Sequence, residues 1–402
     1  MQHIMTIMRH SGGSSSIATE RAIMNATRTL TAPAALIAAV LASIAVSAQA
    51  PAGEIDAHVT AARTAAGQEY RATFVNLCFS GGNPGAARGG GAPPAGGRDG
   101  AAPAAGRGAG APARGGGAAA PAAGGGAAPA GGRAAGGRGA GGTPDRATWY
   151  ASPYKVFDNL YWLGTRQHSS WALRTSEGLI IIDTNFAWAT EPEIINGLTT
   201  LGLDPKQIKY VLISHAHGDH DQGAGELQKR FGAKVVMGSA DWESTLQRPA
   251  TAAGGVPTRD IAVGPEGYKL KLGDTTVDIV LTPGHTPGTL SYVFPVQDQG
   301  KTVMVAYSGG TLTGAFGSDA ARWDQYIDSQ KRIAKAAADA GATVILSNHS
   351  EYDGAYTKAR LIAAKREVGE EHPFVIGAPG VQRYFTVMTE CATASKLRSN
   401  AK

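Results

Sequence analysis

Short apolar runs alternate with stretches of helical periodicity over residues 143–402 of the chain. Short runs rich in β-branched and aromatic residues predict strands, and apolar residues that recur every three or four positions predict helices. Because the two kinds of element interleave throughout, we expect one α/β domain at 143–402 rather than an all-β sandwich. The expected strands are Trp171–Thr175, Leu179–Asp183, Tyr210–Ser214, Lys234–Met237, Thr276–Leu281, Leu290–Phe294, Thr302–Ala306 and Thr343–Ser347, and the expected helices are Glu191–Leu201, Gly218–Phe231, Asp319–Ala340 and Tyr356–Val368.

A further helical pattern precedes this domain, at residues 51–80. Its apolar side chains form one stripe with spacings of three or four residues, made of Ile55, Val59, Ala62, Ala66, Tyr70, Phe74 and Leu77. An amphipathic helix cannot bury such a stripe alone, so we expect it to dock elsewhere. Cys78 ends the pattern, and Cys391 is the only other cysteine. In an exported protein these two tend to pair, which would tie the helix to the main domain; two unpaired thiols are the alternative.

Residues 34–46 form an apolar run of 13 residues, AALIAAVLASIAV. The run is shorter than the ~20 residues that a membrane-spanning helix needs, but it suits the core of a signal peptide. Arg28 precedes the run and small residues follow it, which predicts a signal peptide at 1–50 cleaved after Ala48 or Ala50, with Met24 as an alternative start. We therefore expect a periplasmic or secreted protein with no stable membrane anchor after processing; an uncleaved anchor is the alternative.

Residues 81–142 contain 25 Gly, 22 Ala, 7 Pro, 6 Arg, one Asn and one Asp. A segment without bulky apolar residues cannot offset the entropy of ordering its backbone, so we expect a disordered insert. The segment 81–142 has a net charge of +5, which equals that of the whole chain. Residues 1–50 have a net charge of +2, so the remaining residues have a net charge of −2. The positive charge therefore lies outside the expected folded domain, and we expect no nucleic-acid partner.

The candidate chemistry is concentrated in the segment 210–223, YVLISHAHGDHDQG. An apolar strand is followed by His215, His217, Asp219 and His220, and imidazole and carboxylate groups are the usual ligands of zinc. Alternate residues on an extended loop face the same way, so His215 and His217 can share one metal ion. Asp219 and His220 open the next helix and point elsewhere, towards a second ion.

Two more histidines follow expected strands. His285 lies in the Pro/Gly turn TPGHTPG at 282–288, and His349 lies in SNH at 347–349. Loops at strand ends are where a rigid sheet presents ligands gathered from distant segments. His168 and His372 lack such a setting and are read as ordinary histidines, with His168 a weak candidate for the rim of the pocket.

These motifs, together with Asp183 in IIIDT, resemble the metallo-β-lactamase superfamily over about residues 150–390. The resemblance implies a four-layer αββα sandwich with two mixed β-sheets and two zinc ions at one edge. It assigns His215, His217 and His285 to the first zinc site, and Asp219, His220 and His349 to the second. Asp183 resembles the buried aspartate that supports the metal loop of the family, and Asp219 would also orient the nucleophile.

Many hydrolases of the superfamily carry a bridging aspartate after the strand that follows the His285-type turn. This chain reads VMVAYSGGTLTG at 303–314, with no acidic residue and no cysteine, which resembles the third subclass of metallo-β-lactamases. That subclass usually binds the substrate carboxylate through serines here, and Ser308 and Thr311 are weak candidates for the role. The resemblance implies a monomeric enzyme that opens the β-lactam amide of a small-molecule substrate with a metal-bound hydroxide. The alternatives are an exported hydrolase of another ester, lactone or amide, and a non-enzymatic metal-binding protein.

Overall fold

The computed structural model describes residues 52–79, 143–311, 316–364 and 370–400, which belong to one compact unit spanning Ala48–Lys402. The expected signal peptide and the expected insert lie outside the described residues.

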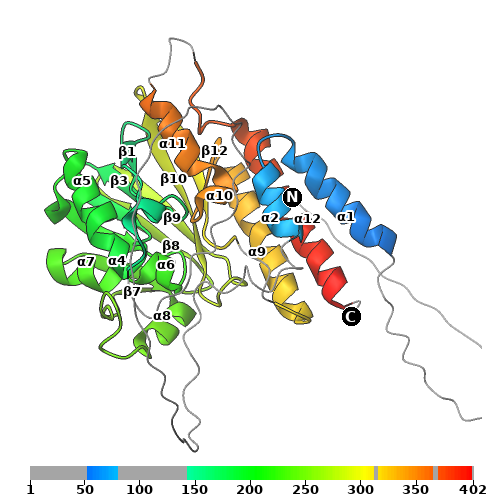
Figure 1. Cartoon of the computed structure of the whole chain (residues 1–402), viewed down its shortest axis with the longest axis horizontal. Helices are drawn as coiled ribbons and strands as arrows, with labels where there is room; N and C mark the ends of the chain where they lie inside the picture. The colour runs from blue at the N-terminus through cyan, green and yellow to red at the C-terminus, as the bar shows by residue number, and fades with distance from the viewer. Residues whose placement is uncertain (1–51, 80–142, 312–315, 365–369, 401–402) are drawn as a thin grey trace, which may run out of the picture. The chain divides into compact units, whose positions relative to one another are not determined.

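Two mixed β-sheets form the centre of this unit (Figure 1). The seven strands of the first sheet lie in sequence order, with antiparallel pairing from β1 to β4 and parallel pairing from β4 to β7. They are β1 (Tyr154–Lys155), β2 (Leu160–Trp162), β3 (Trp171–Thr175), β4 (Gly178–Ile182), β5 (Ile208–Leu212), β6 (Lys234–Gly238) and β7 (Ile261–Val263).

The second sheet has the strand order β12-β11-β10-β9-β8. Its strands β8 to β11 are antiparallel neighbours, and β12 is parallel to β11. The strands are β8 (Tyr268–Leu272), β9 (Thr275–Leu281), β10 (Leu290–Asp298), β11 (Lys301–Ser308) and β12 (Val344–Ser347).

Helices cover the outer face of each sheet, as Figure 1 shows. On the first sheet these are chiefly η2, α5, α7 and α8. On the second sheet they are α9 and α12, and α1 and α2 pack on α12. The described helices are α1 (Ala52–Ala66), α2 (Arg71–Phe79), α3 (Arg146–Trp149), α4 (Ala187–Ala189), η2 (Thr190–Ile195), α5 (Asn196–Thr200), η3 (Pro205–Gln207), α6 (Gly218–Asp221), α7 (Ala224–Phe231), α8 (Ser239–Leu246), α9 (Ala320–Asp339), α10 (Ser350–Asp353), α11 (Ala355–Ala363) and α12 (Gly377–Asn400).

The buried side chains of β4 show how these layers are held together. Successive residues of a strand point to opposite faces of the sheet. Ile180 and Ile182 accordingly pack between the two sheets, whereas Leu179 and Ile181 pack against the helices outside the first sheet. Because both faces are covered, the strand is apolar at nearly every position rather than alternating. The arrangement confirms the predicted four-layer αββα fold with two mixed sheets.

The N-terminal stripe is buried as predicted, but it lies on two helices instead of one. Ala62, Ala66 and Tyr70 are buried against the main domain. The chain breaks between α1 and α2 at Gly67, which adopts a left-handed conformation with φ of 51°. Glycine reaches this conformation at little cost, and it ends the helix there.

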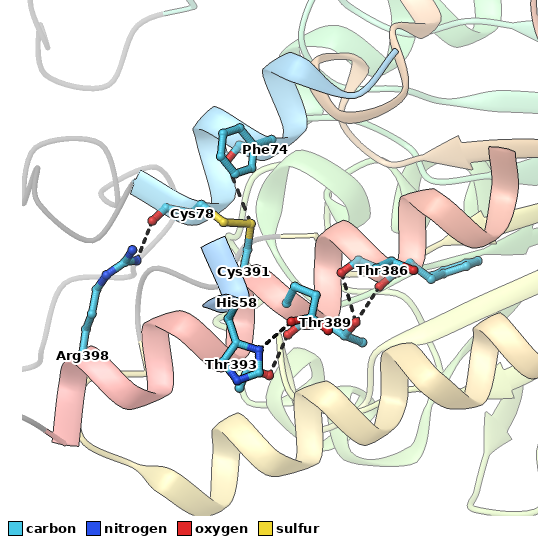
Figure 2. The surroundings of a disulfide bond; sticks show 10 residues. His58, Phe74, Cys78, Thr386, Thr389, Cys391, Thr393 and Arg398 are labelled. Carbon is cyan, nitrogen blue, oxygen red and sulfur yellow. Dashed lines mark hydrogen bonds and ion pairs between the residues drawn. A yellow bond between two sulfur atoms is a disulfide. The ribbon is translucent and has the colours of Figure 1, made fainter. Parts of the chain in front are cut away.

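A disulfide joins α2 to α12 through Cys78 and Cys391, 313 positions apart in the sequence (Figure 2). Beside it, Arg398 of α12 donates a hydrogen bond to the carbonyl oxygen of Cys78 at 2.7 Å. The predicted pairing is therefore present in the structure. None of the helices in the described part of the chain has the length and apolarity that crossing a membrane requires.

Candidate metal centre

The main ligand loop follows β5, at the carboxyl end of the parallel half of the first sheet. Ser214 donates its backbone N–H and its hydroxyl to the carboxylate of Asp183 at 2.7 and 2.8 Å. The same carboxylate accepts a hydrogen bond from the hydroxyl of Tyr307, on β11, at 2.7 Å. Asp183 is fully buried and has a φ of 59°, a conformation that aspartate reaches more easily than most residues. These contacts link the loop to both sheets and fit the supporting position that the sequence predicts for Asp183.

The first group of candidate ligands consists of His215, His217 and His285. Their ligand atoms all lie within 4.8 Å of one another. Nε2 of His285 is 3.1 Å from Nε2 of His215 and 3.1 Å from Nδ1 of His217. Nδ1 of His215 lies 2.9 Å from the carbonyl oxygen of Gly309. Because a carbonyl can only accept, Nδ1 carries the proton and Nε2 turns its lone pair towards the centre of the group.

The second group lies around the carboxylate of Asp219. Oδ2 of Asp219 is 3.2 Å from Nε2 of His220, 3.4 Å from Nε2 of His349 and 3.5 Å from Nε2 of His168. The Nε2 atoms of His220 and His349 are 3.2 Å apart. Nδ1 of His220 lies 3.2 Å from Oδ2 of Asp183, so the aspartate that holds the loop also orients a member of this group.

Both groups fit zinc, because their donors are imidazole nitrogens and one carboxylate. Two ligands of a tetrahedral zinc ion, each ~2.0–2.2 Å from the metal, are about 3.3–3.6 Å apart. The distances between ligand atoms, 3.1 Å in the first group and 3.2–3.5 Å in the second, are close to this value. A cation between the donors would satisfy the converging lone pairs, which cannot all be satisfied by protons.

Burial and mutual charge set the protonation of these groups. Burial lowers the pKa of His217 and holds the pKa values of His215 and His349 well below the usual range, so these rings are neutral at pH 7. Burial alone would raise the pKa of Asp219, but the neighbouring imidazoles, His220 first, lower it well below its usual range. Burial would also lower the pKa of His220, yet Asp219 and Asp183 raise it to about 10. A metal ion bound there would displace that proton.

Asp241 of α8 joins two of the ligand loops. Its Oδ2 accepts hydrogen bonds from the backbone N–H of Ala216 at 2.8 Å and from the hydroxyl of Thr286 at 2.7 Å. Its Oδ1 accepts from the backbone N–H of Gly288 at 2.9 Å. Asp241 is buried, so these bonds fix the loop between His215 and His217 against the turn that carries His285.

The turn that carries His285 depends on glycine. Gly284 has a φ of 137°, and a Cβ at this position would lie 2.7 Å from Cα of Tyr326. Arg322 of α9 donates hydrogen bonds to the carbonyl oxygens of Gly284 and His285 at 2.9 and 2.8 Å. The close approach of α9 thus holds the turn rigid and presents the imidazole to the first group.

Comparisons with known proteins agree with this geometry. Residues 163–298 match the family model of the metallo-β-lactamase superfamily. This segment is a domain of the metallo-β-lactamase superfamily. The structure is similar to that of BJP-1, a subclass B3 metallo-β-lactamase of Bradyrhizobium japonicum, with a TM-score of 0.52 and 26% identity over 62% of this chain and 96% of that one. A metallo-β-lactamase of Cronobacter sakazakii gives a TM-score of 0.51 and 26% identity, with 61% and 88% of the two chains covered.

In sequence, the chain is also similar to members of the superfamily with another activity. It is 36% identical over 88 residues to the hydroxyacylglutathione hydrolase of Acidiphilium cryptum, a match that covers 22% of this chain and 31% of that protein. The chain spans about a third of the length of the curated relatives that it matches first. The solved structures and the sequence relatives of the chain are therefore named for different hydrolase activities.

The superfamily fold brings all six predicted metal ligands together, but the two weak substrate candidates are buried. Ser308 is fully buried, and Thr311 is 1% exposed and donates a hydrogen bond to Oδ1 of Asn348 at 3.1 Å. Residues 312–315 of the same segment lie outside the described residues. A direct substrate contact by either hydroxyl stays a prediction.

Two residues near the ligands are not assigned by the sequence. His168, which the sequence suggests only for the rim of the pocket, lies beside Asp219 and His349 of the second group, and Asp241 joins the ligand loops. Neither residue belongs to a sequence motif that contains the other ligands, so their positions near the site become evident only in the folded structure. His372 is an ordinary core histidine, as predicted: it stacks on Phe157, and its Nε2 lies 2.8 Å from the carbonyl oxygen of Val156.

Proposed function

We propose that the protein is an exported, monomeric zinc hydrolase that opens the amide bond of β-lactams. The observation that carries the proposal is the donor set of the two groups. Asp219 is the only carboxylate among the ligand atoms, and the end of β11 offers the first group a backbone carbonyl, that of Gly309, instead of a bridging carboxylate. This set resembles that of the third subclass, and the similarity to the subclass B3 enzyme BJP-1 supports the same reading.

The residues of the chain suit this chemistry. Zinc bound by the two groups would polarise a substrate carbonyl and supply a nucleophile from water at neutral pH. The three histidines of the first group would hold one ion and leave a coordination position open. Asp219, ionised at neutral pH, is the carboxylate that can orient a water molecule. No serine or cysteine nucleophile is needed in this scheme.

A second candidate is hydrolysis of another ester, thioester or lactone on the same scaffold. The similarity in sequence to hydroxyacylglutathione hydrolases favours it, because those relatives are named for another substrate. Ser308 and Thr311, the two residues suggested for binding a β-lactam carboxylate, are both buried.

A substrate panel separates these candidates. The zinc-loaded full chain is assayed with a chromogenic cephalosporin, a carbapenem, a homoserine lactone and a hydroxyacylglutathione thioester. We expect turnover of at least one β-lactam with a kcat/KM of about 10⁴ M⁻¹s⁻¹ or more, in the usual enzymatic range. Turnover of the thioester or lactone without any β-lactam would reject the first proposal in favour of the second. Binding of zinc without turnover of the panel would favour a metal-binding protein.

Export to the periplasm is a separate proposal. The disulfide between Cys78 and Cys391 supports it, because such bonds persist mainly in oxidising compartments. N-terminal sequencing of protein recovered from a bacterial periplasm is expected to begin after Ala48 or Ala50. A chain found only in the cytoplasmic fraction with an intact N-terminus would contradict export.

A further inference from the structure

The loop between β2 and β3 carries His168 and is attached to the loop that carries His349. The backbones of these two histidines form an isolated antiparallel bridge. On one side of it, Ser169 donates its N–H to the carbonyl oxygen of Asn348 at 2.9 Å; on the other, Ser350 donates its N–H to Gln167 at 2.9 Å. The position of His168 relative to the second group is therefore set by backbone hydrogen bonds, not by a free loop.

The ring of His168 is also oriented by its neighbours. Nδ1 lies 3.3 Å from the hydroxyl of Thr165, a residue that is 1% exposed, and the ring packs edge-on against Phe186. Nε2 then points to Asp219, with 3.5 Å between it and Oδ2. A ring nitrogen held by an oxygen while the other faces the site is the arrangement usual for a histidine that ligates a metal.

The distance from Nε2 of His168 to Oδ2 of Asp219 is also close to the distances of the predicted ligands from this oxygen. His220 and His349 lie 3.2 and 3.4 Å from Oδ2 of Asp219, against 3.5 Å for His168. The ligand atoms of His168, Asp219 and His349 all fall within 4.8 Å of one another. His168 therefore lies as close to Asp219 as His349 does, on the side of the carboxylate away from His220, whose ring centroid is 6.3 Å from that of His168.

We propose that His168 is a fourth protein ligand of the second metal ion, together with Asp219, His220 and His349. This inference rests on the proposed two-metal centre, and it assigns different roles to the two metal ions. Four protein ligands complete the tetrahedral shell of zinc, as in structural sites, whereas three leave a position open for water or substrate. The ion bound by His215, His217 and His285 would then be the one that meets the substrate, and the second ion would hold the two ligand loops together.

Metal titration of the full chain tests the proposal. Metal is removed by chelation, and Zn²⁺ is added back in competition with a chromophoric chelator, with Co²⁺ absorption as a second readout. The variants are His168→Leu, which removes the ligand, and His168→Gln, whose amide can still donate a hydrogen bond to Asp219. His58→Ala is the matched control, because His58 is a partly buried histidine with one carboxylate partner, Glu390, outside both groups.

We expect both His168 variants to bind the first equivalent of zinc like the wild type and the second at least about tenfold more weakly. The Co²⁺ bands of the second equivalent should change in both, and the control should match the wild type. Three results would overturn the proposal. The first is wild-type zinc affinity and Co²⁺ spectra in both variants, and the second is a wild-type chain that binds only one ion. The third is wild-type affinity in His168→Gln alone, which would show that His168 acts as a hydrogen-bond donor.

The thermal unfolding of each metal-free variant shows whether a loss of affinity merely reflects misfolding. If His168→Leu unfolds early, His168→Gln provides the same comparison with a polar side chain of similar volume. A wild-type chain that binds two ions through His168 but hydrolyses nothing in the substrate panel would leave this inference standing and reject the proposed function.

Discussion

Asp183 is the residue on which the geometry of the metal loop most depends. Its carboxylate is buried and accepts hydrogen bonds from Ser214 and Tyr307, and it faces Nδ1 of His220 at 3.2 Å. Partners of this kind fix the tautomer of a ligating histidine and tune its affinity for the metal. The shape of the site is therefore set by a residue that is not itself among the candidate ligands.

Asp183→Asn tests this role. In one orientation the NH₂ group of the amide faces the backbone N–H of Ser214, and in the other it faces Nδ1 of His220. A hydrogen-bond donor therefore faces another donor in either orientation. We expect a loss of about 1–3 kcal/mol in the free energy of unfolding and about 10–100-fold weaker binding of the second metal ion. Chemical denaturation and zinc titration measure the two effects. The exposed Asp328→Asn, on α9, is the control; equal second-site affinity in the two variants would disprove the assignment.

Glu193 gives a pH-dependent prediction. This buried carboxyl accepts a hydrogen bond from the backbone N–H of Ala151 at 3.2 Å, and burial raises its pKa from 4.5 to about 8. Because the folded state holds the proton more tightly, stability is fully present below pH 4.5 and is lost as the pH rises towards 8. Glu193→Gln keeps the acceptor and removes the ionisation.

We therefore expect Glu193→Gln to be about as stable as the wild type near pH 4.5 and progressively more stable than it up to about pH 8. Thermal unfolding of metal-free protein at several pH values measures the difference. Glu177→Gln, an exposed site between β3 and β4, should show no such trend. A constant difference between Glu193→Gln and the wild type over this pH range would contradict the prediction.

At the scale of the elements, the candidate ligands lie on loops, and on the short helix α6, that follow strands of both sheets. The motif at 215–220 follows β5, His285 follows β9, and His349 follows β12. The sequence could predict these positions because apolar strands and the motifs after them are contiguous. It could not predict His168, whose neighbour His349 is far along the chain and is reached only through the bridge between their backbones.

The helices show the same distinction. The predicted helix Gly218–Phe231 is split into α6 and α7, and the 24-residue helix α12 is not evident from the sequence. α12 packs against α1 and α2 as well as against α9 and β12, so it buries several faces and shows no single apolar stripe. A helix of this kind is recognised only once its neighbours are in place.

The disulfide between α2 and α12 provides a prediction at this scale. A bridge between residues 313 positions apart restricts a very long loop in the unfolded chain. We expect the double variant Cys78→Ser, Cys391→Ser to lose about 2–5 kcal/mol in the free energy of unfolding, measured by denaturant titration. Its metal content should be unchanged, because every candidate ligand lies outside these helices. A reductant should lower the free energy of unfolding of the wild type only. Equal free energies of unfolding of the two proteins without reductant would show that the disulfide does not stabilise the fold.

At the scale of the molecule, three buried interfaces place the two groups of ligands at one edge of the sheets. One lies between the sheets, and one lies under each helical layer. The alternation of strands and helices and the ordered ligand motifs were enough to predict this architecture. The identity of the substrate could not be predicted from the sequence, because no motif in it is specific to one substrate and the relatives have more than one activity.

The central claim is that a two-zinc centre built on His215, His217 and His285, with Asp219 beside it, carries out the hydrolysis. The most direct test measures zinc per chain and turnover of the best panel substrate in the wild type and in His217→Ala, with circular dichroism to check the fold. We expect two zinc ions in the wild type, loss of the first-site ion in His217→Ala, and at least about a hundredfold loss of turnover with the fold retained. A variant that keeps two zinc ions and full turnover would contradict the account.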